Sequence, residues 1–338
     1  DRDRPRMVKR HDGTQPQASR IAALLIFQPG PMPASILETC DLLTGLGYGV
    51  LVVSNGPLLP ASRGALLPHV WRVLERPNLG YDFGGYREAV MHLWDEKADP
   101  DELLILNDSV WIVASVFPAF LDQLRALNAE VTGSVMRSKK GKRWIESYFF
   151  RITRPALTHP AFRKFWLDYR LVDSKFGVIR QGERDFTVAL AEGGLQVAAL
   201  GDNAEFLAAL AKAPDEELRI ALTYAAPVTG GLAEDRARLL ASTPEPHWRT
   251  RALAHFGVVL DGKRVWNSQF PVAAQRRLAY PFIKKSREQS NFVLREQVLA
   301  GIEDRMFAPA TSAAMSELVA QQRRGPDFEP AWMPTNSR

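Results

Sequence analysis

The sequence predicts an α/β fold with a largely parallel sheet over roughly its first 200 residues, followed by a helical and irregular C-terminal region. Two observations support this prediction. Short continuous apolar runs, closed by turn residues, alternate with longer amphipathic stretches. The first three segments, at residues 21–27, 35–46 and 48–53, have the spacing of a right-handed strand–helix–strand unit. In such folds ligands bind outside the carboxyl ends of the strands.

Each element follows from a local pattern. Residues 21–27 form an apolar run bounded by Gln-Pro-Gly-Pro, as a buried strand would be, and residues 48–53 form a second run closed by Ser-Asn-Gly-Pro. Residues 35–46 carry apolar side chains at helical spacing and end in Gly-Leu-Gly, which is a helix stop. Further strands are predicted at 69–74, 102–106, 131–135 and 147–152, and further helices at 84–94, 117–127, 162–169, 184–192 and, in an Ala- and Leu-rich stretch, 203–241.

We expect three segments along the chain. Residues 1–20 are polar, carry a net charge of +3 and show no apolar periodicity, which predicts a disordered basic tail. Residues 21–205 would form the ligand-binding and catalytic α/β domain. Residues 206–338 would form a helical C-terminal region that completes the site, with irregular stretches around its prolines, which include Pro244, Pro246, Pro271 and Pro281.

The formal net charge of +5 on 338 residues is unevenly distributed. Five basic residues lie within residues 137–143, and eight Lys or Arg with a single Glu lie within residues 263–295, whereas the rest of the body is acidic. A charge run is usually a solvated face, but two clusters on an acidic body predict a localised anion site. No nucleic-acid-binding motif accompanies them, so we do not expect a nucleic-acid partner.

Composition excludes several classes of protein. A single Cys excludes a disulfide framework and a multi-cysteine zinc site, and Cys40 on the first predicted helix is expected to be a small core residue. No apolar stretch approaches the roughly 18 residues of a membrane span. No secretory signal is visible near the start, so we expect a cytoplasmic protein. No Gly-x-Ser-x-Gly elbow supports a serine hydrolase.

The densest chemical segment is Arg-Pro-Asn-Leu-Gly-Tyr-Asp-Phe-Gly-Gly-Tyr at residues 76–86. Its glycines permit positive φ angles or a close backbone approach, and Asn78 and Asp82 bring hydrogen-bonding side chains. The segment precedes a predicted helix whose free N–H groups could face a ligand. A tight turn with an Asp cap is the alternative. The segment is neither a dinucleotide fingerprint nor a Walker A loop, because the required spacing is absent.

Two further acidic segments follow predicted element boundaries. Asn107-Asp108-Ser109 comes directly after an apolar strand, where a carboxylate can ligate a hard divalent cation that also binds phosphate. Glu183 and Asp185 lie at or near the N-terminus of the helix at 184–192, where a carboxylate can act as a base toward a hydroxyl. Helix or turn capping is the alternative in both places.

Five segments match a known family in order and spacing over residues 21–290. They are Asn-Leu-Gly-Tyr-Asp-Phe-Gly-Gly-Tyr at 78–86, Leu-Asn-Asp-Ser-Val at 106–110, Glu-Ser-Tyr-Phe at 146–149, Gly-Glu at 182–183 and Tyr-Pro-Phe-Ile-Lys-Lys at 280–285. The chain thereby resembles the rhamnan synthesis protein F family of bacterial polysaccharide glycosyltransferases. The resemblance implies a GT-A fold, a Rossmann-like α/β domain that transfers a sugar from a nucleotide-sugar donor.

The resemblance also implies roles for individual residues. Asp108 would take the place of the Asp-x-Asp motif and bind a divalent metal, Mg²⁺ or Mn²⁺, although the second Asp is absent. Glu183 would be the general base, with Asp185 as its rival, and Glu146 and Ser147 would contact the acceptor. The family often has Gln in place of Glu146. The donor-binding residues would be Phe27, Ser54, Asn55, Asn78, Asp82, Asn107, Lys284 and Lys285.

By this resemblance the chain would transfer rhamnose or another deoxyhexose to a hydroxyl of a growing O-antigen or capsule polysaccharide, by an inverting single displacement. Its partners would be a nucleotide-sugar and a lipid-linked or oligosaccharide acceptor, and peripheral association with the inner face of the cytoplasmic membrane is compatible with this. Two alternatives remain open: a Rossmann-type enzyme using NAD or S-adenosylmethionine, and a non-catalytic protein that binds anionic surfaces through the basic clusters.

Overall fold

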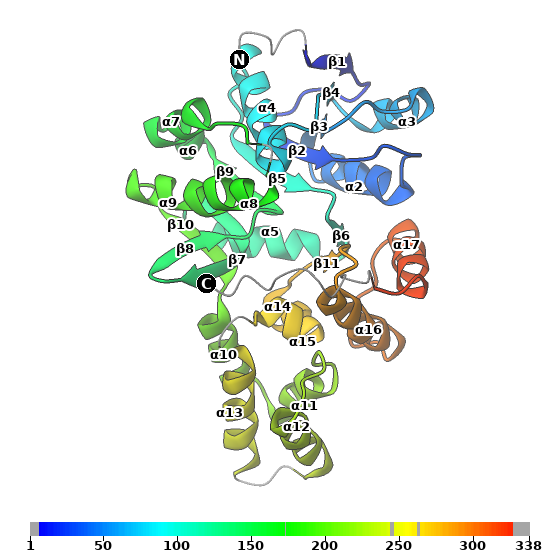
Figure 1. Cartoon of the computed structure of the whole chain (residues 1–338), viewed down its shortest axis with the longest axis vertical. Helices are drawn as coiled ribbons and strands as arrows, with labels where there is room; N and C mark the ends of the chain where they lie inside the picture. Colours follow the sequence, from blue (N-terminus) through cyan, green and yellow to red (C-terminus); the bar gives the residue numbers. More distant parts are fainter. Residues whose placement is uncertain (1–6, 173, 244–246, 262–263, 327–338) are drawn as a thin grey trace.

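A computed structural model describes residues 7–172, 174–243, 247–261 and 264–326. Its centre is a nine-stranded sheet in the order β1-β4-β3-β2-β5-β9-β7-β10, with β8 paired to β7 outside this path. Figure 1 shows the sheet in the upper part of the molecule and helices α10 to α13 as an extension below it. The fold class predicted from the sequence, an α/β fold with a mostly parallel sheet and a helical C-terminal part, is confirmed.

The parallel half of the sheet contains β2 (Arg20–Ile26), β3 (Tyr48–Ser54), β4 (Arg72–Glu75) and β5 (Glu102–Asn107). β2, β3 and β5 consist mostly of apolar residues because both faces of the sheet are covered, whereas β4 has Arg72 and Glu75 at its ends. In the other half, β9 (Phe149–Thr153) runs antiparallel between β5 and β7 (Val131–Lys139), and β10 (Val197–Gly201) runs parallel to β7. β8 (Lys142–Ile145) closes a hairpin with β7.

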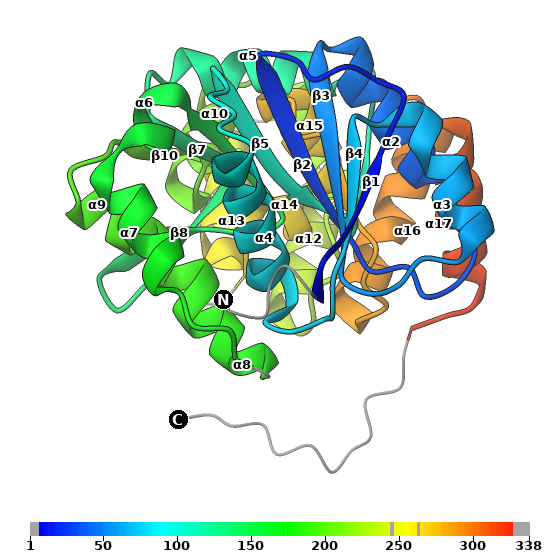
Figure 2. The ribbon, with the colours of Figure 1, turned by 90° about the horizontal axis from the view of Figure 1, so that it is seen from above.

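Helices cover both faces of the sheet. On one face α4 (Tyr81–Asp95), α7 (Pro160–Asp168) and α9 (Asp185–Glu192) bury aromatic side chains in a common cluster. On the other face α2 (Ala34–Gly45) and α5 (Phe117–Ala126) contribute to a second cluster, which includes Cys40 as the sequence predicts. Figure 2 shows α7, α8 and α9 at one end of the molecule and α2, α3 and α17 at the other.

The C-terminal region is helical and shares a core with the sheet. Phe206, Trp266 and Phe270 belong to the same buried cluster as Leu24 and Leu104 of the central strands. Its elements are α10 (Asn203–Ala211), α11 (Asp215–Thr223), α12 (Gly231–Ala241), α13 (Trp248–Leu260), α14 (Trp266–Gln269), α15 (Pro271–Leu278), β11 (Phe282–Lys284), α16 (Gln289–Glu303) and α17 (Ser312–Arg323). β11 pairs antiparallel with β6 (Val110–Ile112), which follows β5. The remaining elements are α3 (Pro60–Leu66), η1 (Leu67–His69), α6 (Arg154–Thr158), α8 (Lys175–Val178) and η2 (Ile179–Arg184).

The prediction of a disordered tail over residues 1–20 is wrong for the part that the structure describes. β1 (Lys9–Asp12) adds to the sheet antiparallel to β4, and Gly13 N–H donates to the Trp71 carbonyl at 2.8 Å. The strand is polar because one side of it faces solvent, and its ion pairs with β4 replace apolar burial. One of them joins Arg72 to Asp12 at 3.0 Å. Residues 1–6 lie outside the described residues, as do Pro244 and Pro246.

Two other expectations are corrected. The boundary after residue 205 falls inside α10, because Asp202 and Glu205 form a capping box that starts this helix at Asn203. The helix expected at residues 84–94 starts earlier, at Tyr81, after Gly80 with a φ of 79°. Among the described residues, no helix has both the length and the apolar character that crossing a bilayer requires.

Candidate active site

Asp108 lies at the carboxyl edge of the parallel strands, directly after β5. Its Oδ2 atom accepts hydrogen bonds from Phe27 N–H at 3.0 Å and from Gln28 Nε2 at 2.7 Å. Its own N–H donates to the Leu25 carbonyl at 3.0 Å. Because β2 and β5 are neighbouring parallel strands, their ends meet at one edge. The contact between Phe27 and Asp108 at this edge is therefore a consequence of the sheet order.

Asn107 connects this edge to helix α4. Its Nδ2 donates to Asp82 Oδ2 at 3.0 Å, and its Oδ1 accepts from the Ser109 hydroxyl at 2.5 Å. Asn107 is only 5% exposed, so its amide has few alternatives to these partners. Asp82, in the first turn of α4, is thereby held against Asn107 at the end of β5.

The segment before α4 is fixed from inside by a buried arginine. Arg76 donates to Asn55 Oδ1 and to the Leu79 carbonyl, both at 2.5 Å, and Asn55 Nδ2 donates to the Tyr81 carbonyl at 2.9 Å. Burial lowers the pKa of Arg76 to about 10. A Cβ atom on Gly84 would lie 2.1 Å from the Leu79 carbonyl oxygen, which explains a glycine there. Asn55 is therefore a structural support of the segment as well as a predicted donor contact.

The other predicted donor residues differ in their exposure. Ser54 is buried, and its hydroxyl donates to the Gly56 carbonyl at 2.8 Å, which holds the turn after β3. Phe27 is 52% exposed at the end of β2, and Asn78 is exposed before α4. Only Phe27 and Asn78 of this group thus present side chains openly to a ligand.

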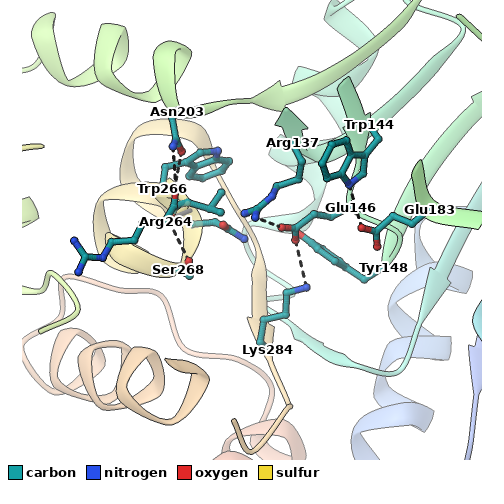
Figure 3. Close-up of polar contacts among 12 residues, drawn as sticks. Arg137, Trp144, Glu146, Tyr148, Glu183, Asn203, Arg264, Trp266, Ser268 and Lys284 are labelled. Atoms are coloured by element: carbon teal, nitrogen blue, oxygen red, sulfur yellow. Dashed lines mark hydrogen bonds and ion pairs between the residues drawn. The ribbon is translucent and has the colours of Figure 1, made fainter. Parts of the chain in front are cut away.

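Glu183 lies in the π-helical turn η2 and is held by residues from β8 and the segment after it. Trp144 Nε1 donates to Oε1 at 3.1 Å, and Ser147 donates to Oε2 twice, from its hydroxyl at 2.7 Å and from its N–H at 3.3 Å. Figure 3 shows the Trp144 indole pointing toward the Glu183 carboxylate. Arg184 lies over the Trp144 ring at 4.9 Å. Three donors fix the orientation of this carboxylate.

Asp185, the predicted rival of Glu183, starts helix α9 two residues further on. Side chains two positions apart on a helix point in different directions. In the structure, Trp144 Nε1 and the Ser147 hydroxyl donate their hydrogen bonds to Glu183. Glu183 is therefore the carboxylate that this part of the molecule orients.

Tyr86 brings the sheet edge and the Glu183 region together. Its hydroxyl, on α4, donates to the Ser147 carbonyl at 2.8 Å. Burial raises the pKa of this hydroxyl well above its ordinary value, and three nearby carboxylates raise it further: Asp82, Glu183 and Asp108. The carboxylates predicted from three separate segments thus all act electrostatically on one buried hydroxyl.

The two predicted lysines point in different directions. Successive side chains of an extended chain alternate between faces. Lys284, at the end of β11, places its Nζ 3.4 Å from Glu146 and 3.6 Å above the Tyr148 ring (Figure 3). Lys285 lies next to Asp108, and burial lowers its pKa while Asp108 opposes that shift. Only Lys285 is therefore at the sheet edge.

Asp108 is under opposing influences. Burial raises its pKa, and the donors from Gln28 and Phe27, together with the charge of Lys285, only partly offset that effect. A partly buried carboxylate with a raised pKa at the carboxyl edge of a sheet is a candidate functional residue.

Glu146, the predicted acceptor contact, lies between two cations. Lys284 Nζ is 3.4 Å and Arg137 Nη1 is 3.7 Å from its carboxylate oxygens. Figure 3 shows both cations converging on Glu146, with Glu183 beyond it. Glu146 and Ser147 are adjacent in sequence, so the predicted acceptor residues lie beside the predicted base.

The donor set around Asp108 limits how a metal could be held. Among the described residues, no three His, Cys, Asp or Glu side chains come together in a cluster suited to a metal ion. Mg²⁺ is often bound through one or two carboxylates together with substrate phosphates. Asp108 fits the arrangement with one carboxylate, in which the diphosphate of a donor would complete the set of ligands.

Sequence reasoning missed several residues of this site. Tyr86 belongs to the segment that carries the family resemblance, but its spacing predicts only an apolar face of α4. Trp144 falls inside a basic cluster, where the charge dominates the pattern. Gln28 directly follows Phe27 at the end of a predicted strand, and this position could have identified it as a residue of the site.

Comparisons with known proteins place these residues in a family context. Residues 50–215 match the family described as Rhamnan synthesis protein F. The protein y4gN of Sinorhizobium fredii (strain NBRC 101917 / NGR234), described as uncharacterized, is 27% identical over 297 residues, which cover 86% of this chain and 76% of that protein.

A solved structure with some similarity is the glycosyltransferase GlyE of Streptococcus pneumoniae TIGR4. It is 11% identical with a TM-score of 0.33, over 73% of this chain and 63% of that one. This chain therefore spans less than two thirds of that glycosyltransferase. The family match covers the segment that holds Asp82, Asp108 and Glu183, and the resemblance predicted from the motifs is confirmed there, since residues 50–215 match the rhamnan synthesis protein F family.

Proposed function

We propose that this protein is a nucleotide-sugar-dependent glycosyltransferase of bacterial polysaccharide synthesis. The observation that carries the proposal is the placement of Asp108 at the carboxyl edge of the parallel strands and its connection to the oriented carboxylate of Glu183, because Tyr86 of α4 and Glu183 both hydrogen-bond to Ser147. The family description, rhamnan synthesis, favours rhamnose or another deoxyhexose as the transferred sugar and a cell-surface polysaccharide as the acceptor.

The proposed reaction is a single displacement at the anomeric carbon. Glu183 accepts the proton of the acceptor hydroxyl as the new carbon–oxygen bond forms. The bond from the anomeric carbon to the diphosphate breaks, and its electron pair leaves with the nucleoside diphosphate. Attack from the side opposite the leaving group inverts the anomeric centre. Glu183 suits this role because Trp144 and Ser147 fix its direction.

The leaving group needs positive charge on the donor side. Lys285 would supply it, since it lies beside Asp108 at the sheet edge. Asp108 would hold a divalent cation jointly with the diphosphate, and that cation would act as a Lewis acid on the leaving oxygen. The exposed ring of Phe27 would stack on the nucleobase, and Asn78 and Asp82 would contact the ribose or the sugar.

The test is a donor screen with the purified protein. Hydrolysis of dTDP-, GDP- and UDP-sugars is measured with Mn²⁺ and with EDTA, together with thermal shifts by the same donors, NAD and S-adenosylmethionine. We expect one nucleotide-sugar to be hydrolysed and to stabilise the fold. Stabilisation by NAD or S-adenosylmethionine, with no response to any nucleotide-sugar, would contradict the proposal. Donor hydrolysis that is undiminished in EDTA would show that the reaction needs no divalent cation, and the role proposed for the cation at Asp108 would then be wrong.

A further inference from the structure

A cavity of about 230 Å³ lies beside Glu146, on the side away from Glu183. It is lined by Arg137 and Ser138 of β7, by the start of α10 at Asn203, and by Arg264. Ligand pockets for nucleotide-sized molecules measure roughly 300–1,000 Å³. This one suits a single sugar ring or a phosphate group.

The cavity has unused positive charge. Within the described residues, the side chain of Arg264 is exposed and makes no hydrogen bond or ion pair. Arg137 has only a loose ion pair, at 3.7 Å from Glu146, whose carboxylate also has Lys284 at 3.4 Å. Figure 3 shows the Arg137 guanidinium directed toward Glu146 and the Arg264 guanidinium directed away from it, so the two cations lie at different parts of the lining, and each can pair with a further anion without breaking a strong contact.

The other polar groups of the lining are already satisfied. The Asn203 side chain donates to the Leu260 and Arg264 carbonyls and accepts from the Trp266 N–H. The one carboxylate of the lining, Asp202, caps α10 and pairs with Arg143 at 3.3 Å. Ser138 adds a hydroxyl donor. The groups left for a ligand are thus two cations and one donor, which favour an oxyanion.

We propose that this cavity binds an oxyanion of the acceptor, the carboxylate of an acidic sugar or a phosphate, and so guides a charged acceptor to Glu183. The inference rests on the proposed function, because it takes Glu146 and Ser147 as the acceptor side of the site. Figure 3 supports the placement, since Asn203 and Arg264 lie on one side of Glu146 while Trp144 and Glu183 lie on the other.

The test measures binding of three probes by calorimetry: methyl β-D-glucuronide, methyl β-D-glucoside and inorganic phosphate. UDP, GDP and dTDP are present throughout, so that the donor site cannot contribute. We expect the glucuronide or phosphate to bind at least about 10-fold more tightly than the glucoside, the ratio that charge-assisted hydrogen bonds give. Tighter binding of the glucuronide identifies an acidic sugar, and tighter binding of phosphate identifies a phosphorylated acceptor.

Two exposed positions make the test specific. Arg264→Ala removes a cation and Ser138→Asp adds a like charge, and each should abolish the preference for the anionic probes. Arg154→Ala, an exposed arginine that pairs with Asp99, is the control and should leave it intact. Equal binding of glucuronide, phosphate and glucoside, or a preference that survives both variants, would overturn the inference. Donor hydrolysis by the same variants reports separately on the proposed function.

Discussion

The sheet-edge region around Asp108 and the region around Glu183 are built in different ways. At the sheet edge, Asp108 is held by the backbone N–H of Phe27 and by the neighbouring Gln28, at the ends of paired strands. Glu183 is held by Trp144 and Ser147, which are 39 and 36 positions away in sequence, through side-chain contacts. The first region depends on strand register, and the second depends on the packing of a hairpin against a π-helical turn.

The difference assigns separate tasks to the two regions. Under the proposed function, strands buried on both faces frame the donor side, and a short hairpin with a π-helical turn frames the acceptor side. π-Helical turns occur often at functional sites, because the wider turn re-aims a side chain. Tyr86 joins the two regions through its hydrogen bond to the Ser147 carbonyl. Each prediction below separates the two regions by asking which one a variant affects.

The largest effect is expected for Glu183→Gln. The amide can still accept hydrogen bonds from Trp144 and Ser147, but it cannot take a proton. Transfer should fall by about 10²–10⁴-fold, the range for loss of a general base. Donor affinity, measured by calorimetry, should stay the same because the donor side is untouched. Asp185→Asn is the matched control, and a larger loss in that variant would move the base to Asp185.

Asp108→Asn should lower transfer by roughly 10–100-fold and weaken donor binding, because the charge that helps to hold the cation and diphosphate is lost. The same change should stabilise the fold. Burial raises the pKa of Asp108, so its ionised form is a net cost above that pKa. The asparagine keeps an acceptor for Phe27 N–H without the charge.

The gain from Asp108→Asn should therefore depend on pH. A folded-state pKa above the unfolded value means that the wild type is stabilised at low pH and loses this as the pH rises. Urea unfolding should show the variant more stable at pH 7 by up to about 1 kcal/mol. The difference should vanish near pH 3.5, below the usual Asp pKa of about 3.9. A variant less stable than the wild type at pH 7 would make Asp108 a structural residue.

Trp144→Phe should reduce the turnover of transfer roughly 10-fold. The phenyl ring fills most of the indole volume, but the hydrogen bond to Glu183 Oε1 is lost, which costs about 1.5–3 kcal/mol where a charged partner is involved. Donor hydrolysis is measured as well, because water takes the place of the acceptor hydroxyl in that reaction. The affinity for the donor should be unchanged. A change in donor affinity without a change in turnover would contradict the separation of the two regions.

Much of the fold could be predicted because parallel strands that are buried on both faces appear in the sequence as continuous apolar runs. Residues 21–27 are shifted by one residue from β2, and residues 48–53 are one residue shorter than β3. Among the strands that were missed, β1, β6, β8 and β11 are short or polar, and β10 is an apolar strand of five residues. They form because a strand elsewhere in the chain has a free edge with which they can pair, and the local sequence contains no pattern that predicts this partner.

The same reasoning applies to the candidate site. The strand ends at Asn55 and Asp108 could be predicted, since parallel strands deliver their carboxyl ends to one edge. The contact between Trp144 and Glu183 could not, because it depends on how the hairpin packs against η2. The opposite directions of Lys284 and Lys285 also needed the structure, which shows that β11 pairs with β6.

The smallest effects, and the sharpest comparison, come from the two adjacent lysines. Lys285→Met should weaken donor binding about fivefold, because a cation beside Asp108 and the diphosphate is lost. Lys284→Met should instead raise the KM for the acceptor by a similar factor, because Glu146 loses its partner at 3.4 Å. Methionine keeps most of the length of both side chains while removing the charge, so the apolar stems still pack near Trp111 and Tyr148. If both variants changed donor affinity alike, the two lysines would act on one ligand and the division between the two regions would fail.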